Sequence, residues 1–363
     1  MAKINALFDE LIKRGGSDLH VAAGYPPMVR IRGELTPLRE TALERREAEE
    51  LLFELLPANQ RTKFRDELDL DFAHQHGESA RFRANYFLKE TGFGGVFRVI
   101  PTRVLSLQEL GAPEVLWRLS ERRAGLVLVT GPTGSGKSTT LAGMIDHINK
   151  TRACHILTIE DPIEFVHQSN RAQVTHREVG VHASTFATAM RSAGRENPDV
   201  VLVGELRTTE TMKLALQLAS FGILIFATVH TNGAAATIER IVNAFPAEEQ
   251  PQARGMLAEA LVGIVAQQLV RAADGKGRVA VHEILVGSPA VSAMVREAKT
   301  AQLGSTMQAG QNVGMQTMEM GLERLMIAGK ISPEVALESA GDKEAFARVV
   351  ARVRPDLADK VAT

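Results

Sequence analysis

The stretch "GPTGSGKST", residues 131–139, contains residue types whose spacing suits phosphate chemistry. Its glycines allow consecutive backbone N–H groups to converge on phosphate oxygens without obstruction by Cβ atoms. A helix predicted to begin at Lys137 adds the positive end of its dipole. Lys137 should bridge the β- and γ-phosphates of a nucleotide, and the Ser138 hydroxyl should ligate Mg²⁺. The predicted nucleotide-binding residues of this Walker A loop are Gly131, Pro132, Thr133, Gly134, Ser135, Gly136, Lys137, Ser138 and Thr139.

Acidic and imidazole side chains follow two predicted apolar strands. Strand 155–159 precedes "EDPIEF", which includes Glu164, and strand 223–228 precedes His230. Ligands of open parallel sheets bind at the carboxyl ends of the strands, so both groups should face the nucleotide. His230 could donate a hydrogen bond to the γ-phosphate. The alternatives are a solvated turn for the acids and a structural role for the histidine.

A third predicted strand, Val200–Val203 in "PDVVLVGELR", ends in Gly204 and Glu205. In P-loop ATPases such a strand usually ends in an aspartate that orders the magnesium ion. The residues alone leave open which group handles the metal and which activates the attacking water.

Other features separate the classes of P-loop protein. No Asn-Lys-x-Asp motif of Ras-type GTPases follows the loop, and no obvious Arg-rich insertion suggests the lid of a small-molecule kinase. A motor ATPase needs a water-polarising acid, a γ-phosphate sensor and arginines from a neighbouring subunit. The chain offers candidates for all three, which favours a motor ATPase that uses ATP.

The order of predicted elements indicates an α/β protein with more than one domain. Residues 1–100 mix short helices with strands: the period-two alternation of "PMVRIRGEL" predicts a strand, and "ARFRANYFLKETGFGGVFRVI" predicts a hairpin. Residues 101–106 are a predicted linker. Residues 107–288 alternate apolar strands with helices, which is typical of a parallel sheet. In residues 289–363 we expect only helices.

Composition excludes several other classes. The net charge of −1, with one Trp and two Tyr, disfavours a nucleic-acid motor, which would need a basic channel bearing aromatic residues. The single cysteine rules out an internal disulfide framework and any zinc site built from two or more cysteines. No run approaches about 18 apolar residues, and the N-terminus predicts a charged amphipathic helix rather than a signal peptide. We therefore expect a cytoplasmic protein without a transmembrane segment.

Together these motifs resemble the PilT family of type IV pilus retraction ATPases, within the secretion ATPase superfamily. The resemblance implies an N-terminal PAS-like α+β domain, a RecA-like ATPase core and a helical C-terminal part. It also implies a homo-hexameric motor that hydrolyses ATP to retract the pilus, by pilin disassembly, in twitching motility. The motifs that carry it, over nearly the whole chain, are "GGSDLH", "RFR", "VFRVIP", "GPTGSGKSTT", "TIEDPIEF", "THREVG", "PDVVLVGELR", "TVHTNGAAATIERI", "IVAQQLV" and "GMQTMEMGLERL".

The resemblance also assigns roles to individual residues. Family enzymes carry glycine before glutamate in this strand, so Glu205 would hold Mg²⁺ through water and Glu164 would polarise the attacking water. Ser138 would supply the direct metal contact. N-terminal-domain arginines of the family approach the nucleotide at the interface between protomers, as arginine fingers do. The corresponding residues are Arg81, Arg83 and Arg98; on the residues alone, alternating arginines on a strand are usually an exposed face.

The implied partners are an inner-membrane pilus platform protein and a paralogous retraction ATPase, at the inner face of the membrane at the pilus base. Two departures from the family pattern bear on this. Ile223 replaces a histidine, so that only His230 of the family's histidine pair remains. In residues 290–297, needed for retraction in relatives, Ser292 replaces an arginine. An accessory, PilU-like retraction role is therefore the alternative. Pilus extension and type II secretion ATPases typically carry a tetracysteine zinc insertion, which a single cysteine argues against.

Overall fold

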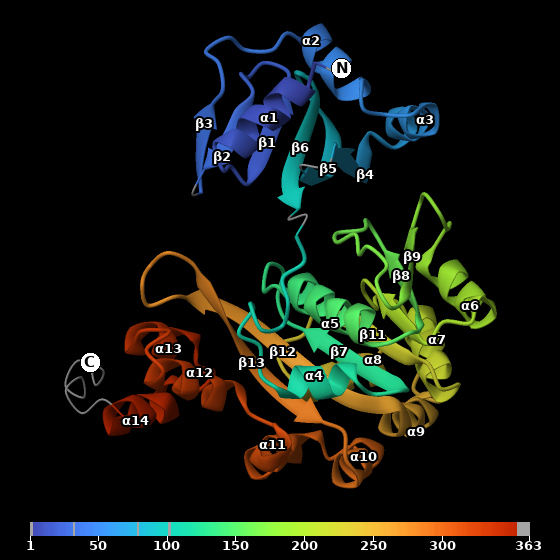
Figure 1. Ribbon diagram of the computed structural model, residues 1–363, viewed down its shortest axis with the longest axis vertical. Coiled ribbons are helices and arrows are strands. Elements are labelled where there is room, and N and C mark those ends of the chain that lie inside the picture. Colours follow the sequence, from blue (N-terminus) through green and yellow to red (C-terminus); the bar gives the residue numbers. More distant parts are fainter. Residues whose placement is uncertain (1–2, 32, 78–79, 101–102, 354–363) are drawn as a thin grey trace. The chain divides into compact units, whose positions relative to one another are not determined.

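The structure is a computed structural model that describes residues 3–31, 33–77, 80–100 and 103–353. The chain divides into two compact units (Figure 1). The first comprises Met1–Val104 together with Asp161–Val166, and the second comprises Leu105–Glu160 and His167–Thr363. Pro101 and Thr102 of the predicted linker, and residues 354–363 of the predicted C-terminal region, lie outside the described residues.

In its described part, the first unit is built on a six-stranded antiparallel sheet with the order β3-β2-β1-β6-β5-β4. The strands are β1 (Asp18–Ala22), β2 (Met28–Ile31), β3 (Glu34–Pro37), β4 (Asp69–His76), β5 (Ala80–Lys89) and β6 (Gly92–Ile100). The helices are α1 (Asn5–Lys13), α2 (Arg45–Phe53) and α3 (Ala58–Glu67).

Helices cover one face of this sheet because alternate strand residues are apolar. Phe8 of α1 stacks on Phe82 of β5 with 4.3 Å between ring centroids, and it meets Phe97 of β6 edge-on at 5.0 Å. Leu52 of α2 and Phe64 of α3 complete the same core. The intervening residues of β5 and β6 are more exposed, and the three predicted arginines belong to this second set.

The structure agrees with two local patterns in the first unit. The predicted hairpin is the antiparallel pair β5–β6, in register from Arg81↔Ile100 to Lys89↔Gly92. The alternating segment "PMVRIRGEL" also forms strand structure, which is divided between two strands, β2 and β3, that pair with one another. Gly33 adopts a φ of 95°, a left-handed conformation that favours glycine and allows the chain to reverse.

The described part of the second unit contains a seven-stranded sheet with the order β13-β12-β7-β11-β10-β8-β9. All of its neighbours are parallel except the edge pair β12–β13. The strands are β7 (Gly125–Thr130), β8 (His155–Glu160), β9 (Gln173–Glu178), β10 (Val200–Val203), β11 (Leu224–Val229), β12 (Leu261–Arg271) and β13 (Arg278–Val286). The predicted strands of the ATPase core are confirmed as β7, β8, β10 and β11, and the structure adds three that were not singled out.

Helices flank this sheet and continue beyond it (Figure 1). They are α4 (Val115–Ser120), α5 (Lys137–Thr151), α6 (Phe186–Glu196), α7 (Thr209–Ser220), α8 (Ala234–Val242), α9 (Gln250–Ala260), α10 (Pro289–Arg296), α11 (Leu303–Ala309), α12 (Met318–Ile327), α13 (Pro333–Ser339) and α14 (Lys343–Val353), with short 3-10 turns at Thr300–Gln302 and Gln311–Val313. As predicted, no strand follows residue 289 within the described chain.

The register of the sheet places the predicted site loops at one edge. Thr130 of β7 pairs with Val229 of β11, so that the phosphate loop and His230 begin at the same level. Val203 of β10 pairs with Ala227, two residues earlier on β11, and Gly204 and Glu205 extend β10 towards that level. The expectation that these loops share the carboxyl edge is confirmed.

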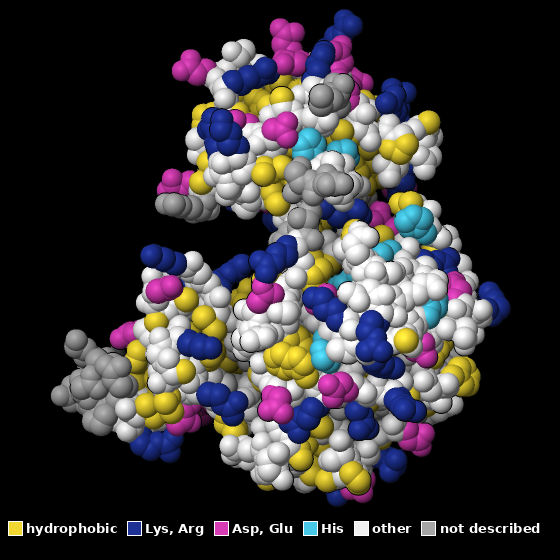
Figure 2. Space-filling view, in the orientation of Figure 1, with side chains coloured by type: hydrophobic (Ala, Val, Ile, Leu, Met, Phe, Trp, Pro, Cys, Tyr) yellow, Lys and Arg dark blue, Asp and Glu magenta, His cyan; other side chains and the backbone are white. Residues whose placement is uncertain are grey.

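Acidic and basic side chains are interspersed over the visible face of each unit, in agreement with the net charge of −1 (Figure 2). Among the described residues, no helix has the length and apolar character that crossing a bilayer requires.

Candidate functional site

The phosphate loop connects the fully buried strand β7 to helix α5, which begins at Lys137 as predicted. Gly131, Gly134 and Gly136 have φ values of 143°, 79° and 85°, which side chains with a Cβ rarely adopt. Lys137 is only 8% exposed, and its Nζ donates hydrogen bonds to the carbonyl oxygens of Gly131 (2.9 Å) and Pro132 (3.0 Å). The loop therefore encloses the Lys137 ammonium group.

Strand β12 supports the loop from the side. A Cβ atom at Gly131 would lie 2.2 Å from the backbone oxygen of Gln267, so only glycine fits there. The Gln267 side chain donates to the Ser135 carbonyl (2.6 Å) and accepts from the Thr140 hydroxyl (2.7 Å). Gln267 belongs to the motif "IVAQQLV", but no role was predicted for it. The signal that could have found it is a polar pair within an otherwise apolar strand.

The residues of the loop suit a nucleotide phosphate. Ser135 is 3% exposed, and its Oγ has no hydrogen-bond partner among the described residues, nor does the buried Oγ1 of Thr130 beside it. A buried hydroxyl without a partner is costly and is satisfied by an oxygen-rich ligand. The described residues contain no group of three or more His, Cys, Asp or Glu side chains able to hold a metal.

Glu205 and His230 lie together at the sheet edge. The Leu206 N–H donates to the Thr228 carbonyl (3.0 Å), which continues the β10–β11 pairing past the end of β10. As a result, Glu205 Oε2 lies 3.6 Å from His230 Nε2, while Glu205 Oε1 lies 2.7 Å from Arg207 Nε. Arg207 has no role in the sequence analysis, although it belongs to the same "GELR" motif. A carboxylate of low exposure is thus held between an imidazole and a guanidinium.

Segment 161–166, with the predicted catalytic acid, belongs to the first unit. Arg81 Nε donates to the carbonyl oxygen of Ile163 (3.0 Å), and Arg83 Nη1 lies 3.9 Å from Glu164 Oε1. Two of the three predicted arginines therefore contact the acidic segment of their own chain. Glu160, at the end of β8, is buried in the second unit.

Arg98 has a different partner. It lies opposite Arg83 across the β5–β6 pair and opposite Asp18 across the β6–β1 pair. Its Nε donates to Asp18 Oδ1 at 2.8 Å. Burial of Asp18 disfavours its charge, but hydrogen bonds from Ser17 and Arg98 hold the pKa of the carboxyl below its usual value. The "GGSDLH" motif thus supplies the carboxylate that pairs with Arg98.

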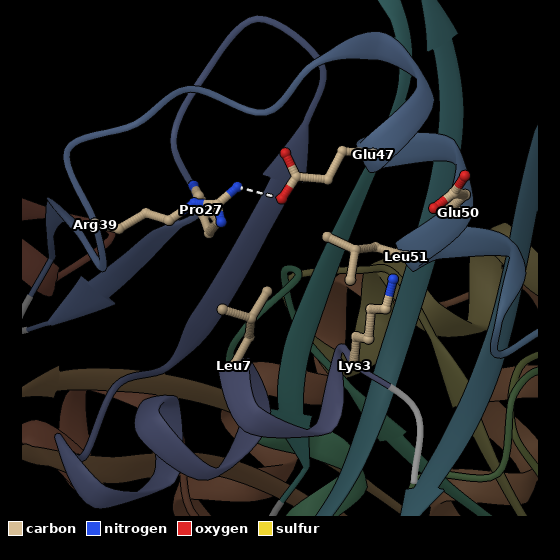
Figure 3. Close-up of a pocket in the computed structure, with 7 residues that line it drawn as sticks. All are labelled: Lys3, Leu7, Pro27, Arg39, Glu47, Glu50 and Leu51. Carbon is tan, nitrogen blue, oxygen red and sulfur yellow. Dashed lines mark hydrogen bonds and ion pairs between the residues drawn. The ribbon is translucent and has the colours of Figure 1, made fainter.

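The first unit also has a pocket of about 220 Å³ between α1, α2 and the strand region, shown in Figure 3. Arg39 Nη2 and Glu47 Oε1 meet at 2.7 Å beside it. Its lining is Lys3, Leu7, Pro27, Arg39, Glu47, Glu50 and Leu51. None of these residues belongs to the predicted site.

Comparison with known proteins identifies the family to which the chain is similar. Residues 2–276 match the family described as "Type II/IV secretion system protein". The chain is 49% identical to the type IV pilus retraction ATPase PilT of Pseudomonas aeruginosa over 334 residues, which cover 92% of this chain and 97% of the relative. It is 47% identical to a twitching motility protein of Neisseria gonorrhoeae, over 88% of this chain and 86% of the relative. The crystal structure of the pilus retraction motor PilT with bound ADP superposes with a TM-score of 0.88 at 41% identity, covering 96% of this chain and all of that one.

The contact between Gly131 and β12 generates a test. Gly131→Ala places a Cβ 2.2 Å from the Gln267 oxygen, so the loop must deform and the affinity for ADP should fall at least about tenfold. Gly255→Ala is the matched control, because it lies within α9 with no atom within 4 Å of the added Cβ. Titration with a fluorescent ADP analogue measures both variants. Equal affinities for the two variants would contradict the assignment of the loop.

Proposed function

This chain belongs to the type II/IV secretion system protein family, and we propose that it is the ATPase motor that powers the retraction of a type IV pilus. The observation that carries the proposal is 49% identity with a pilus retraction ATPase over nearly the full length of both chains. The intact phosphate loop and the Glu205–His230 pair supply the local chemistry that such a motor needs.

In the proposed mechanism, Lys137 exchanges partners when the nucleotide binds. Its ammonium group now contacts two neutral carbonyl oxygens, and phosphate oxygens are stronger acceptors because they are charged. Lys137 therefore moves to the β- and γ-phosphates. Mg²⁺, when bound, would neutralise charge on the same oxygens. We assign its direct contact to Ser138 and a contact through water to Glu205.

The proposed general base is Glu164, and the proposed γ-phosphate sensor is His230. The Arg83 guanidinium lies 3.9 Å from Glu164 Oε1 and can orient that carboxylate towards the attacking water. His230 is half-exposed and 3.6 Å from Glu205, so its ring can respond both to the γ-phosphate and to the Glu205 carboxylate. Loss of the γ-phosphate would then change the contacts of both His230 and Glu205.

The role of Glu164 can be tested by an isosteric substitution. Glu164→Gln should bind ATP normally but hydrolyse it at least about 10²-fold more slowly, because a general base is lost. Glu248→Gln, at an exposed glutamate between α8 and α9, is the control and should keep the wild-type rate. Steady-state phosphate release and ATP binding are measured for both. A normal rate for Glu164→Gln would transfer the role to Glu160 or Glu205.

We further propose that the motor is a homo-hexamer in which the arginines of one subunit complete the site of the next. Arg83 is exposed by nearly half, and 3.9 Å from Glu164 is longer than a direct hydrogen bond, which leaves its donors available to a phosphate. The Arg81 Nε is used by the Ile163 carbonyl, and the Arg98 Nε by Asp18. Among the three, Arg83 is therefore the preferred arginine finger, a group that contributes about 10³- to 10⁵-fold in rate elsewhere.

The ring proposal predicts that hydrolysis depends on assembly. The ATPase rate per subunit should fall steeply when the protein is diluted below hexamer dissociation, as followed by light scattering. Mixing Lys137→Ala chains with Arg83→Ala chains should restore part of the activity, because one supplies the arginine and the other the nucleotide. Arg46→Ala, at an exposed arginine of α2, is the control for Arg83→Ala and should keep the wild-type rate by itself. A rate per subunit that stays constant into the monomer range would refute the proposal.

The proposed coupling element is α10, which would transmit motion to a pilus platform protein at the inner face of the membrane. Ser288 caps its N-terminus, and Val291 and Val295 are buried against the core. Ser292, where relatives carry arginine, donates to the Ala258 carbonyl of α9 (2.7 Å) and so faces inward. Arg296 and Glu297 are exposed at the end of the helix, where Glu297 Oε2 lies 2.7 Å from Lys299 Nζ, and we propose that this exposed end meets the partner.

A genetic experiment tests retraction and coupling together. Deletion of the gene in the source bacterium should give excess surface pili and loss of twitching, whereas loss of pili would indicate an extension motor. Complementation with Lys137→Ala should fail, because the loop loses its cation. The double variant Arg296→Ala/Glu297→Ala should keep its ATPase rate and still fail to restore twitching. Normal pili and twitching in the deletion strain would indicate an accessory, PilU-like role or another motor function.

A further inference from the structure

Gln267 is a buried amide side chain on an otherwise largely apolar, buried strand. It is 2% exposed and lies on β12, directly beside the phosphate-loop strand β7 (Figure 1). Its Nε2 donates to the carbonyl oxygen of Ser135 at 2.6 Å, and its Oε1 accepts from Thr140 Oγ1 at 2.7 Å. Because Ser135 precedes Lys137 and Thr140 follows it, one side chain joins the loop to the first turn of α5.

His282 forms a second hydrogen bond with the amide oxygen of Gln267. It lies opposite Gln267 in the antiparallel β12–β13 pair and is 4% exposed. Its Nε2 lies 3.1 Å from Gln267 Oε1, an atom that can only accept, so Nε2 carries the proton. Burial lowers the pKa of the His282 imidazole to about 4, so the ring is neutral at physiological pH.

The backbone of His282 is held by a further hydrogen bond. Gln316 Nε2 donates to the His282 backbone carbonyl at 2.7 Å, and Gln316 forms an antiparallel bridge with Ile284 of β13. Close packing also leaves Gln267 little room, because a Cβ added at Gly136 would lie 2.8 Å from its Nε2. The His282 backbone is thus held by Gln316, and the Gln267 amide lies close against Gly136 of the loop.

We propose that Gln267 and His282 are positioning residues that hold the phosphate loop and the first turn of α5 in the shape that receives the β-phosphate. Neither residue touches the nucleotide in this proposal. His282 orients the Gln267 amide, and the amide fixes the Ser135 carbonyl and the Thr140 hydroxyl. The inference rests on the proposed ATPase function but concerns nucleotide affinity, which is measured without hydrolysis or a pilus.

Loss of this support should weaken binding rather than chemistry. Without Gln267, the Ser135 carbonyl and the Thr140 hydroxyl lose their partners, and the nucleotide must order the loop as it binds. Once the phosphate is bound, the catalytic groups are those of the wild type. The expected signature is a raised Kd and KM with little change in kcat at saturating ATP.

The experiment compares Gln267→Met, which keeps the volume but removes all three side-chain hydrogen bonds, with Gln268→Met, its neighbour on β12, as control. For Gln267→Met the Kd for ADP should rise about tenfold, which corresponds to about 1.4 kcal/mol, while the Kd for AMP, which has no β-phosphate, changes less than twofold. His282→Leu should raise the Kd for ADP about threefold. His282→Gln, which retains an N–H donor, should restore wild-type affinity.

A double-mutant cycle tests whether His282 acts through Gln267. In the Gln267→Met background, His282→Leu should add less than twofold to the Kd for ADP, and an independent threefold effect would contradict this link. An unchanged ADP affinity in Gln267→Met, or equal losses for ADP and AMP, would overturn the proposal. If Gln267→Met lacks the wild-type circular dichroism, the His282→Leu and His282→Gln pair decides, and equal affinities in that pair would overturn it.

The experiment distinguishes failure of the positioning role from failure of the proposed function. A wild-type protein that binds ADP but shows no change in Gln267→Met would refute the positioning role and leave the ATPase assignment intact. A wild-type protein with no affinity for ADP would refute both.

Discussion

The close approach of Gly131 to the backbone of Gln267 is the constraint on which the candidate site depends. Strands β7 and β12 are parallel neighbours, and the chain that leaves β7 must turn into the phosphate loop against β12. A Cβ at residue 131 would lie 2.2 Å from the Gln267 oxygen, so only glycine permits this turn. The same contact brings the Gln267 amide within hydrogen-bond distance of Ser135 and Thr140.

Around this fixed loop, the register of the parallel sheet determines which side chains meet. His230 begins level with the phosphate loop because Thr130 pairs with Val229, and the pairing of Leu206 with Thr228 brings Glu205 beside His230. Backbone hydrogen bonds therefore align this part of the site.

The proposed catalytic set is divided between the two units. The phosphate loop, Glu205 and His230 belong to the second, whereas Glu164 and the arginines belong to the first. Segment 161–166 leaves and re-enters the second unit but is bonded to Arg81 of β5 through the Ile163 carbonyl. Segment 161–166 is therefore tied to the sheet of the first unit by a hydrogen bond, although its flanking residues belong to the second unit.

The sequence by itself determined the features that local patterns encode. The glycine spacing of the phosphate loop, the helix beginning at Lys137, four core strands and the β5–β6 hairpin were all predicted, because a strand, turn or helix start depends on residues close in sequence. Only the tertiary structure decided that Arg98 pairs with Asp18, that Arg207 flanks Glu205 beside His230, and that Gln267 supports the loop. The first and last of these contacts span 80 and 132 residues. Strand order and register bring such residues together, and no local pattern specifies them.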